Sequence, residues 1–126
     1  MASAHATVRK QFGLSIGKFE GIQEPLARIV GFAYLLEEAR RFTCGGLDGG
    51  AKPAVVTAMS KSNCTELYRK TVNYGMDILA GNAIYLGPLN LLANIYTGMP
   101  INIAVEGANI LTRSFIIFGQ EGIRCH

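Results

Sequence analysis

The stretch "PAVVTAMSKSNCTELYRKTVNYGMDILAGN", Pro53 to Asn82, decides the fold because it predicts one long amphipathic helix. Its apolar residues recur at helical spacing and comprise Val56, Met59, Leu67, Tyr68, Val72 and Met76. Pro53 suits the first position of a helix, and Gly81 with Asn82 ends the pattern. We interpret the stripe of Met and Tyr residues as core packing.

A second amphipathic helix precedes this stretch. Its apolar face consists of Leu26, Ile29, Val30, Ala33, Leu36 and Ala39. The opposite face carries acidic residues three or four positions before basic ones, namely Glu37, Glu38, Arg40 and Arg41. The pattern leaves open whether the helix begins at Pro25 or earlier, around Gly17, with a kink at the proline. The run "GGLDGG", Gly45 to Gly50, ends it.

The second half of the chain carries few charges. Residues 1–70 hold 16 of the 21 charged side chains, and Ile78 to Val105 is a block of 28 residues without Asp, Glu, Lys or Arg. The block contains Pro88, Pro100, three glycines and four asparagines, which argue against a transmembrane helix. We expect it to cross a buried or interface-facing side of the fold, where these asparagines and glycines find backbone or ligand partners.

Two shorter helices are predicted after the long ones, the first of them within the uncharged block. One is predicted from Pro88 to about Tyr96, closed by Gly98 and Pro100. The last is predicted from about Glu106 to Phe118, ends at Gly119, and is apolar around almost its whole circumference, so we expect it to be buried on most sides. Because no alternating strand pattern or internal repeat is present, we predict an all-α antiparallel helical bundle.

Composition excludes several classes of function. The 126 residues suit one domain, and a net charge of +3 without an Arg/Lys stripe is no nucleic-acid footprint. The cysteines, Cys44, Cys64 and Cys125, lack metal-like spacing, and the amino terminus lacks the apolar core of a signal peptide. We therefore expect reduced thiols, a cytoplasmic location and no metal. His5 and His126 have no partner in view for nucleophilic chemistry.

Three stretches carry a family resemblance: "RKQFG" at Arg9–Gly13, "MDILAGNAIYLGP" at Met76–Pro88 and "VEGANILTRS" at Val105–Ser114. Their order and spacing resemble the C-terminal helical domain of the acyl-CoA dehydrogenases. The wording of "IGKFEGIQEPLARI" and "VEGANILTRSFIIFGQEGIRCH" is most similar to the large bacterial type. The resemblance implies that residues 1–126 are a fragment, inactive alone, of a protein with a preceding helical domain and a middle β-domain.

The resemblance also implies an activity. Members of this family use FAD to oxidise an acyl-CoA to the trans-2-enoyl-CoA in fatty acid β-oxidation. An electron-transfer flavoprotein then reoxidises the flavin. A homo-oligomer in the bacterial cytoplasm is expected on the same grounds.

By this resemblance Arg9, Gln11 and Phe12 meet the FAD pyrophosphate and adenosine, commonly those of a neighbouring protomer. A guanidinium suits that place because its planar donors fit phosphate oxygens in pairs. Taken without the other motifs, "RKQFG" also fits a solvated basic turn with a buried Phe12.

"DILAGN" aligns with a family segment in which a glutamine and three glycines approach the adenine end of FAD. Asp77 stands at the glutamine position, and of the glycines only Gly81 is kept. An aspartate accepts hydrogen bonds but does not donate them, so Asp77 fits a cofactor contact and a surface acid at a helix end equally well.

"VEGAN" matches the region that holds the family's catalytic glutamate. The resemblance assigns Glu106 as the base that takes the α-proton, and Gly107 as the residue that lets the thioester approach. Ala108 and Ile110 replace a threonine and a glutamine that are usual there. Taken alone, Glu106 fits a cap of the last helix. A non-catalytic helical module that oligomerises through its apolar half is the alternative function.

Overall fold

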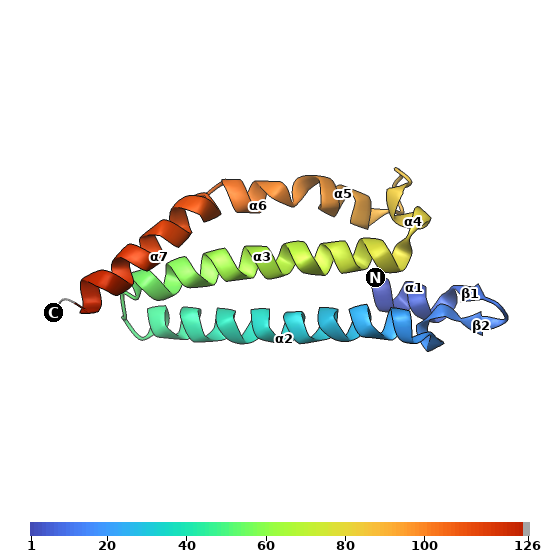
Figure 1. Cartoon of the computed structure of the whole chain (residues 1–126), viewed down its shortest axis with the longest axis horizontal. Coiled ribbons are helices and arrows are strands. Elements are labelled where there is room, and N and C mark those ends of the chain that lie inside the picture. Colours follow the sequence, from blue (N-terminus) through green and yellow to red (C-terminus); the bar gives the residue numbers. More distant parts are fainter. Residues whose placement is uncertain (125–126) are drawn as a thin grey trace.

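Helices α2 (Glu20–Asp48) and α3 (Ala54–Leu79) form the central pair of this all-α chain. In the computed structural model, which describes residues 1–124, they run antiparallel and share the most extensive helix–helix packing (Figure 1). The rings of Phe32 and Tyr74 lie 6.2 Å apart between the two helices, and the Arg28 guanidinium lies 5.9 Å above the Tyr74 ring. These contacts add an aromatic and a cation–π link to the aliphatic packing.

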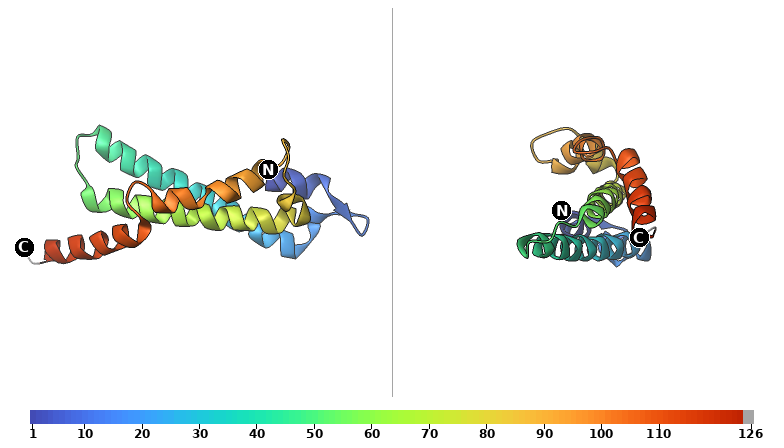
Figure 2. Two further views of the ribbon diagram at one scale, coloured as in Figure 1. Left: turned by 90° about the horizontal axis from the view of Figure 1, so that it is seen from above. Right: turned by 90° about the vertical axis from the view of Figure 1, so that its left-hand side faces the viewer.

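The rest of the chain returns along the other side of α3. After the short α4 (Gly81–Ile84), helices α5 (Leu91–Gly98), α6 (Pro100–Ala104) and α7 (Asn109–Arg124) follow one another back towards the start of α3. Helix α3 therefore lies between α2 and the α5–α7 series, as Figures 1 and 2 show. The predicted all-α antiparallel bundle is confirmed.

The amino-terminal end adds elements that the sequence analysis did not predict. Helix α1 (Ala2–Val8) leads into a two-stranded antiparallel hairpin, β1 (Lys10–Gln11) and β2 (Leu14–Ser15), and a 3₁₀ turn, η1 (Ile16–Lys18). A strand of two residues is too short to show the alternation by which strands are recognised. The hairpin projects from the end of the bundle where α3 ends and α2 begins (Figure 1).

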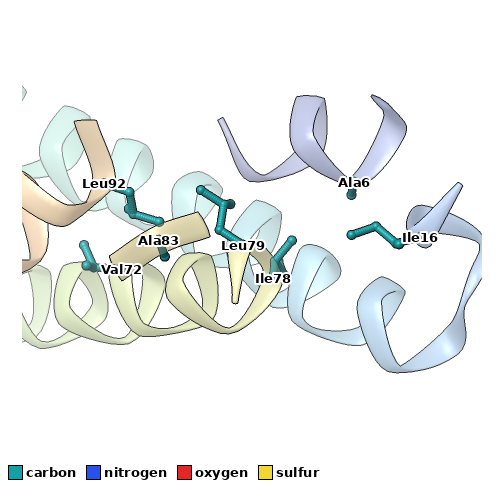
Figure 3. Close-up of a cluster of buried hydrophobic side chains, with 7 residues drawn as sticks. All are labelled: Ala6, Ile16, Val72, Ile78, Leu79, Ala83 and Leu92. Carbon is teal, nitrogen blue, oxygen red and sulfur yellow. The ribbon is translucent and has the colours of Figure 1, made fainter. Parts of the chain in front are cut away.

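The main buried cluster lies at this same end of the molecule. Figure 3 shows its members, which come from α1, η1, α3, α4 and α5: Ala6, Ile16, Val72, Ile78, Leu79, Ala83 and Leu92. Partly buried residues of α2, among them Ile22, Leu26 and Ile29, pack against it. Close approach is required here, because a Cβ on Gly75 would lie 3.3 Å from Leu92 Cδ2. The core therefore supports the hairpin end directly.

Several predicted helix boundaries are corrected. Helix α2 begins at Glu20, between the two predicted starts, and Pro25 lies inside its early turns, where few intrahelical bonds are lost. It continues through Gly45 and Gly46 to Asp48 before Gly50 (φ +83°) reverses the chain. Helix α3 begins one residue after Pro53 and ends at Leu79, close to the prediction.

The helix predicted from Pro88 begins three residues later, at Leu91, because the Asn90 side chain caps it. Asn90 Oδ1 accepts a hydrogen bond from the Ala93 N–H (3.2 Å), and Nδ2 donates to the carbonyls of Asn82, Ala83 and Tyr85 (2.9, 2.9 and 2.6 Å). Asn90 thus finds the backbone partners that we expected of the asparagines in the uncharged block. The other three, Asn82, Asn94 and Asn102, are exposed, and within residues 1–124 their side chains make no hydrogen bond, so for them the expectation is not met within this chain.

The prediction for the last helix is wrong in extent and in burial. Helix α7 begins at Asn109, not Glu106, and runs past Gly119 to Arg124. It leaves the line of α5 and α6 and crosses the start of α3, where a Cβ on Gly119 would lie 3.0 Å from Val55 Cγ2. Ile116 is half-buried, but five other large apolar residues of the helix are each more than half exposed, namely Ile110, Leu111, Phe115, Ile117 and Phe118. Within this chain α7 is packed on one side only.

Among the described residues, one segment, Leu92–Gly122, is long and apolar enough to cross a membrane by length and composition, and an 18-residue stretch within it has a mean hydropathy of 1.3. A single such segment is weak evidence for a span, and here it is divided among α5, α6 and α7. The absence of a transmembrane segment stays a prediction. Cys125 and His126 lie outside the described residues.

Candidate functional site

A cavity of about 470 Å³ lies where the hairpin meets the carboxyl end of α3. It is lined by residues of α1, the hairpin, η1, α2, α3 and the α3–α4 turn, including all five predicted flavin-binding residues: Arg9, Gln11, Phe12, Asp77 and Gly81. In the sequence these residues fall into two groups more than sixty positions apart. The fold therefore brings the two predicted cofactor motifs together in one place.

The hairpin wall is shaped by a two-residue turn. Phe12 (φ +53°) and Gly13 (φ +78°) both adopt left-handed backbone angles between the paired residues Gln11 and Leu14. Turns of this kind match the twist of the flanking strands and favour glycine at their second position. The Phe12 side chain is 92% exposed and meets the Phe19 ring edge-to-face at 6.3 Å. The alternative interpretation of "RKQFG" as a solvated basic turn is therefore right about the turn but wrong about a buried Phe12, because this residue is exposed.

Arg9 is held by its backbone and leaves its side chain free. Its N–H donates to the His5 carbonyl (2.8 Å), and its carbonyl accepts from the Ile16 N–H (2.9 Å). Within residues 1–124 no hydrogen bond or ion pair occupies its exposed guanidinium. The donors of Arg9 are available to an anion at the cavity. His5, which sequence reasoning set aside, lines the same cavity from α1.

The opposite wall is the end of α3. Asp77 is exposed in the last turn of the helix and forms no ion pair among the described residues. Ala80 then takes an unusual conformation (φ +49°, ψ −130°) while its N–H still donates to the Met76 carbonyl at 2.8 Å. Gly81 opens α4 directly after this bend. The bend turns a short backbone segment without bulky side chains towards the cavity.

Glu106 and Gly107 form the turn between α6 and α7, away from this cavity. Glu106 is exposed and has φ +57°, and Gly107 has φ +88°. A side chain at Gly107 would be strained by that angle, although a Cβ there would meet only Thr112 Oγ1, at 3.5 Å. Because α7 begins three residues after Glu106, the alternative that Glu106 caps this helix is not what the turn shows.

A partly buried polar cluster, centred on the buried Asn109, ties this turn to α3. Lys61 Nζ donates to the carbonyls of Gly107 (2.5 Å) and Ile103 (3.3 Å) and to Asn109 Oδ1 (2.7 Å). Asn109, which is 2% exposed, donates through Nδ2 to Thr65 Oγ1 (2.8 Å) and Glu66 Oε1 (3.3 Å). These contacts span 42 to 48 residues of sequence, so no local pattern pointed to Lys61.

An open groove of about 500 Å³ runs beside the turn. Its lining residues come from α2, α3 and the α6–α7 region: Leu36, Lys61, Cys64, Thr65, Tyr68, Asn102, Val105 and Glu106. Thr65 in this groove and Asp77 at the first cavity are 12 residues apart on α3, which is about 18 Å along a helix axis. Glu106 therefore does not share one pocket with the predicted flavin-binding residues of the same chain.

Backbone strain marks all three motifs. Among the described residues, the non-glycine residues with positive φ are Phe12, Ala80 and Glu106. One lies in each of the stretches "RKQFG", "DILAGN" and "VEGAN". Such conformations cost about 1–3 kcal/mol each and cluster at ligand sites and active sites. The positive φ angles are a property of the backbone. They therefore support the three motifs independently of the sequence similarity by which the motifs were identified.

Comparisons with known proteins agree with one another. A family model described as "Acyl-CoA dehydrogenase, C-terminal domain" matches residues 1–118. Over 113 residues, 89% of this chain, the sequence is 32% identical to the mitochondrial very long-chain specific acyl-CoA dehydrogenase of Mus musculus and 31% identical to that of Homo sapiens. The chain spans about 17% of the length of these curated relatives.

A solved structure gives the same fold. The structure described as "FAD complex of PigA" superposes with a TM-score of 0.87 at 20% sequence identity. The match covers 98% of this chain and 31% of that chain. At this level of identity the likeness establishes the architecture, here the helical bundle with its projecting hairpin.

Proposed function

Since this chain belongs to the acyl-CoA dehydrogenase family, as its C-terminal domain, we propose that it forms part of an FAD-dependent enzyme that oxidises acyl-CoA to trans-2-enoyl-CoA in fatty acid β-oxidation. In this proposal Glu106 is the base and the hairpin cavity is part of the FAD site. An electron-transfer flavoprotein as electron acceptor and a bacterial cytoplasmic location belong to the same proposal.

We propose further that the chain works together with an N-terminal helical domain and a middle β-domain. The length of its curated relatives, of which it spans about 17%, supports this arrangement. The exposed Glu106 supports it too, because a base that removes a weakly acidic proton needs a covered, water-poor site. The fragment alone is then inactive.

The observation that carries the proposal is the strained backbone at Phe12, Ala80 and Glu106. A bundle that merely packs has no need for left-handed residues at three turns, and glycine would serve each turn at lower cost. Strain that persists at several places together is typical of sites that hold a ligand. Here two of the places face one cavity and the third bears the proposed base.

The hairpin cavity suits a dinucleotide cofactor by its donor chemistry. The unoccupied guanidinium of Arg9 can give paired hydrogen bonds to phosphate oxygens, and the exposed ring of Phe12 offers a flat apolar surface. Gly81 adds backbone that a ligand can approach closely. When bound, FAD supplies the acceptor for the two electrons of the oxidation.

Thr65, which lines the groove beside Glu106, and Asp77, which lines the cavity, are about 18 Å apart along α3. We therefore propose that the cofactor held by the hairpin is the one that a neighbouring protomer uses. This places a homo-oligomer within the proposal. The hairpin projects from the bundle end (Figure 1), so the rest of the bundle does not obstruct a contact between the hairpin and a neighbouring protomer.

Glu106 performs the proton transfer in the proposed reaction. One of its carboxylate oxygens takes the proton from the α-carbon of the thioester, and the α,β double bond forms as the β-hydrogen leaves with its electron pair, for which the bound flavin would be the acceptor. The thioester carbonyl needs a hydrogen-bond donor as charge develops on it, and the backbone N–H of Glu106 is the donor we propose. Leu36, Tyr68 and Val105 give the adjoining groove an apolar wall against which the acyl group can lie.

The test is Glu106→Gln in the flavoenzyme that contains this chain, with butanoyl-, octanoyl- and palmitoyl-CoA as probes. The amide keeps the size of the side chain but cannot accept the proton. Flavin and acyl-CoA binding should stay within twofold, while the rate of flavin reduction by substrate should fall at least about 1,000-fold. Glu121→Gln, an exposed acid on α7, is the matched control. Near-normal reduction in Glu106→Gln would assign the base elsewhere.

A second function has one observation in its favour. The exposed apolar residues of α7, such as Phe115 and Phe118, are what a non-catalytic oligomerisation module would use. That module would form a stable oligomer by analytical ultracentrifugation when the chain is expressed alone, and it would do so equally well after Arg9→Ala and Glu106→Gln. Flavin binding in the larger protein that depends on Arg9 would exclude it as the sole function.

A further inference from the structure

The ammonium group of Lys61 donates hydrogen bonds to the segment that contains Glu106. An ammonium group has three hydrogens to donate, and Lys61 Nζ uses them on three acceptors: the carbonyls of Ile103 and Gly107 and the side chain of Asn109. Two of these acceptors stand three residues before and one residue after Glu106. The side chain of Lys61 therefore holds both ends of the segment that bears the proposed base.

Lys61 is not an ion-pair partner of Glu106. Both residues line the same groove, yet among the described residues no ion pair joins them. Within residues 1–124 the Glu106 carboxylate has no ion-pair partner, while the peptide units beside it are fixed. This arrangement restrains position and leaves the carboxylate free to accept a proton.

Further hydrogen bonds extend the same restraint. Thr112 Oγ1 lies 3.1 Å from both the Gly107 and the Ala108 carbonyl oxygens and shares its one hydrogen between them, so the Gly107 carbonyl meets an ammonium and a hydroxyl. Asn109, which accepts from Lys61, is anchored to α3 by Thr65 and Glu66. The turn thus has links to α3 on one side and to the first turn of α7 on the other.

We propose that Lys61 is a positioning residue for Glu106: it holds the strained Val105–Ala108 turn so that the carboxylate stands ready for the α-proton. The inference rests on the proposed function of Glu106. Left-handed backbone at a glutamate is unfavourable by itself, and a charge-assisted hydrogen bond to the adjacent carbonyl offsets that cost. Without it the turn relaxes and the carboxylate moves from its reactive geometry, which small displacements disturb strongly.

The test compares Lys61→Met with Lys70→Met in the flavoenzyme that contains this chain. Methionine keeps an unbranched side chain without donors, and Lys70 is an exposed lysine of the same helix α3. For Lys61→Met we expect FAD occupancy and the dissociation constant of octanoyl-CoA within twofold of the unsubstituted enzyme. The rate of flavin reduction at saturating octanoyl-CoA should fall 10- to 100-fold. Lys70→Met should leave all three unchanged.

A chemical rescue separates positioning from general destabilisation. In Lys61→Ala, ethylammonium ion can refill the vacated space and donate hydrogen bonds, whereas tetramethylammonium ion carries the charge without donors. We expect ethylammonium alone to raise the rate of flavin reduction. Equal effects of the two ions, or none from either, would overturn the assignment of Lys61 as the donor.

The outcomes also separate this inference from the proposed function. Suppose that Glu106→Gln abolishes flavin reduction, and that the rate of flavin reduction in Lys61→Met stays within twofold of that of the unsubstituted enzyme. The inference about Lys61 then fails and the proposed function stands. If Glu106→Gln itself reduces flavin normally, both fail. Should Lys61 variants not yield folded flavoprotein, Thr112→Val decides: it removes the second donor to the Gly107 carbonyl, and we expect a three- to tenfold slower reduction. A rate within twofold would overturn the inference.

Discussion

The hairpin cavity and the Glu106 turn are built by different forces. Ile16, Ile78 and Leu79 line the cavity and also belong to the buried apolar cluster, so the core itself supports that wall. Helix α6, by contrast, has no buried residue, and the turn after it is held by hydrogen bonds that Lys61 and Thr112 donate to the Gly107 carbonyl and by Asn109, which accepts from Lys61 and donates to Thr65 and Glu66. Packing spreads a restraint over many atoms, whereas a polar cluster concentrates it in a few. The Glu106 turn should therefore be far more sensitive to single polar substitutions.

The largest effect on stability that tests this comparison is expected for Asn109→Leu. Leucine has a similar volume but removes an acceptor from Lys61 and the donors to Thr65 and Glu66. Removing these partners from three half-buried polar groups should lower the free energy of unfolding by about 2 kcal/mol. Chemical denaturation followed by circular dichroism measures it, with the exposed Asn63→Leu of α3 as the control. Equal stability of the two variants would break the comparison.

An effect of a different kind is expected at the cavity. Arg9→Ala removes an exposed side chain that no described residue uses, so the free energy of unfolding should not change. Loss of a charge-assisted contact to phosphate should weaken FAD binding by about 2 kcal/mol, roughly thirtyfold. Lys10→Ala is the control, because Lys10 is exposed on β1 and does not line the cavity. Flavin titration of the three proteins gives the answer, and full FAD affinity in Arg9→Ala would remove Arg9 from the site.

The smallest effect is expected on the exposed face of α2. Hydrogen bonds from Arg40 and Arg41 lower the pKa of Glu37 from 4.5 to about 2. Because the folded state favours the charged carboxylate, its contribution to stability is complete above pH 4.5 and is lost as the pH falls towards 2. NMR titration of the Glu37 carboxyl should give a midpoint near 2 that rises in Arg40→Ala/Arg41→Ala. Since the side chains of Glu37, Arg40 and Arg41 are exposed, high salt should weaken their ion pairs. Neither FAD binding at the hairpin cavity nor proton transfer at Glu106 should change in the Arg40→Ala/Arg41→Ala variant.

Much of the fold followed from local pattern. The apolar repeat of α3 and its end before Gly81 were predicted closely because helical spacing and a glycine stop act within a few residues. Helix α7 was predicted to be buried, but most of its large apolar residues are exposed in this chain. A helix that is apolar on all sides is expected to be covered, but its sequence does not tell whether the same chain or a partner covers it. Helix α1 and the hairpin were missed because their elements are short and draw support from the core at Ala6 and Ile16.

The two sites differ in the same way. The resemblance of sequence motifs to a family assigned five residues to one cofactor: Arg9, Gln11, Phe12, Asp77 and Gly81. The fold places all five around one cavity. The spacing of these motifs could not predict that Glu106 would stand in a separate groove, because that depends on how far α5 and α6 run back along α3. His5 entered the cavity for the same reason, through the position of α1.

The sequence by itself determined the two long helices of the bundle, the family and the residue types available for chemistry, because these depend on periodicity and short motifs. Tertiary structure alone decided that Lys61 reaches the carbonyls around Glu106 and that Phe12 and Arg9 face solvent. Those facts join residues up to 46 positions apart, or concern which surface a side chain meets. Local sequence cannot encode them, since they exist only once α3 lies between its two neighbours.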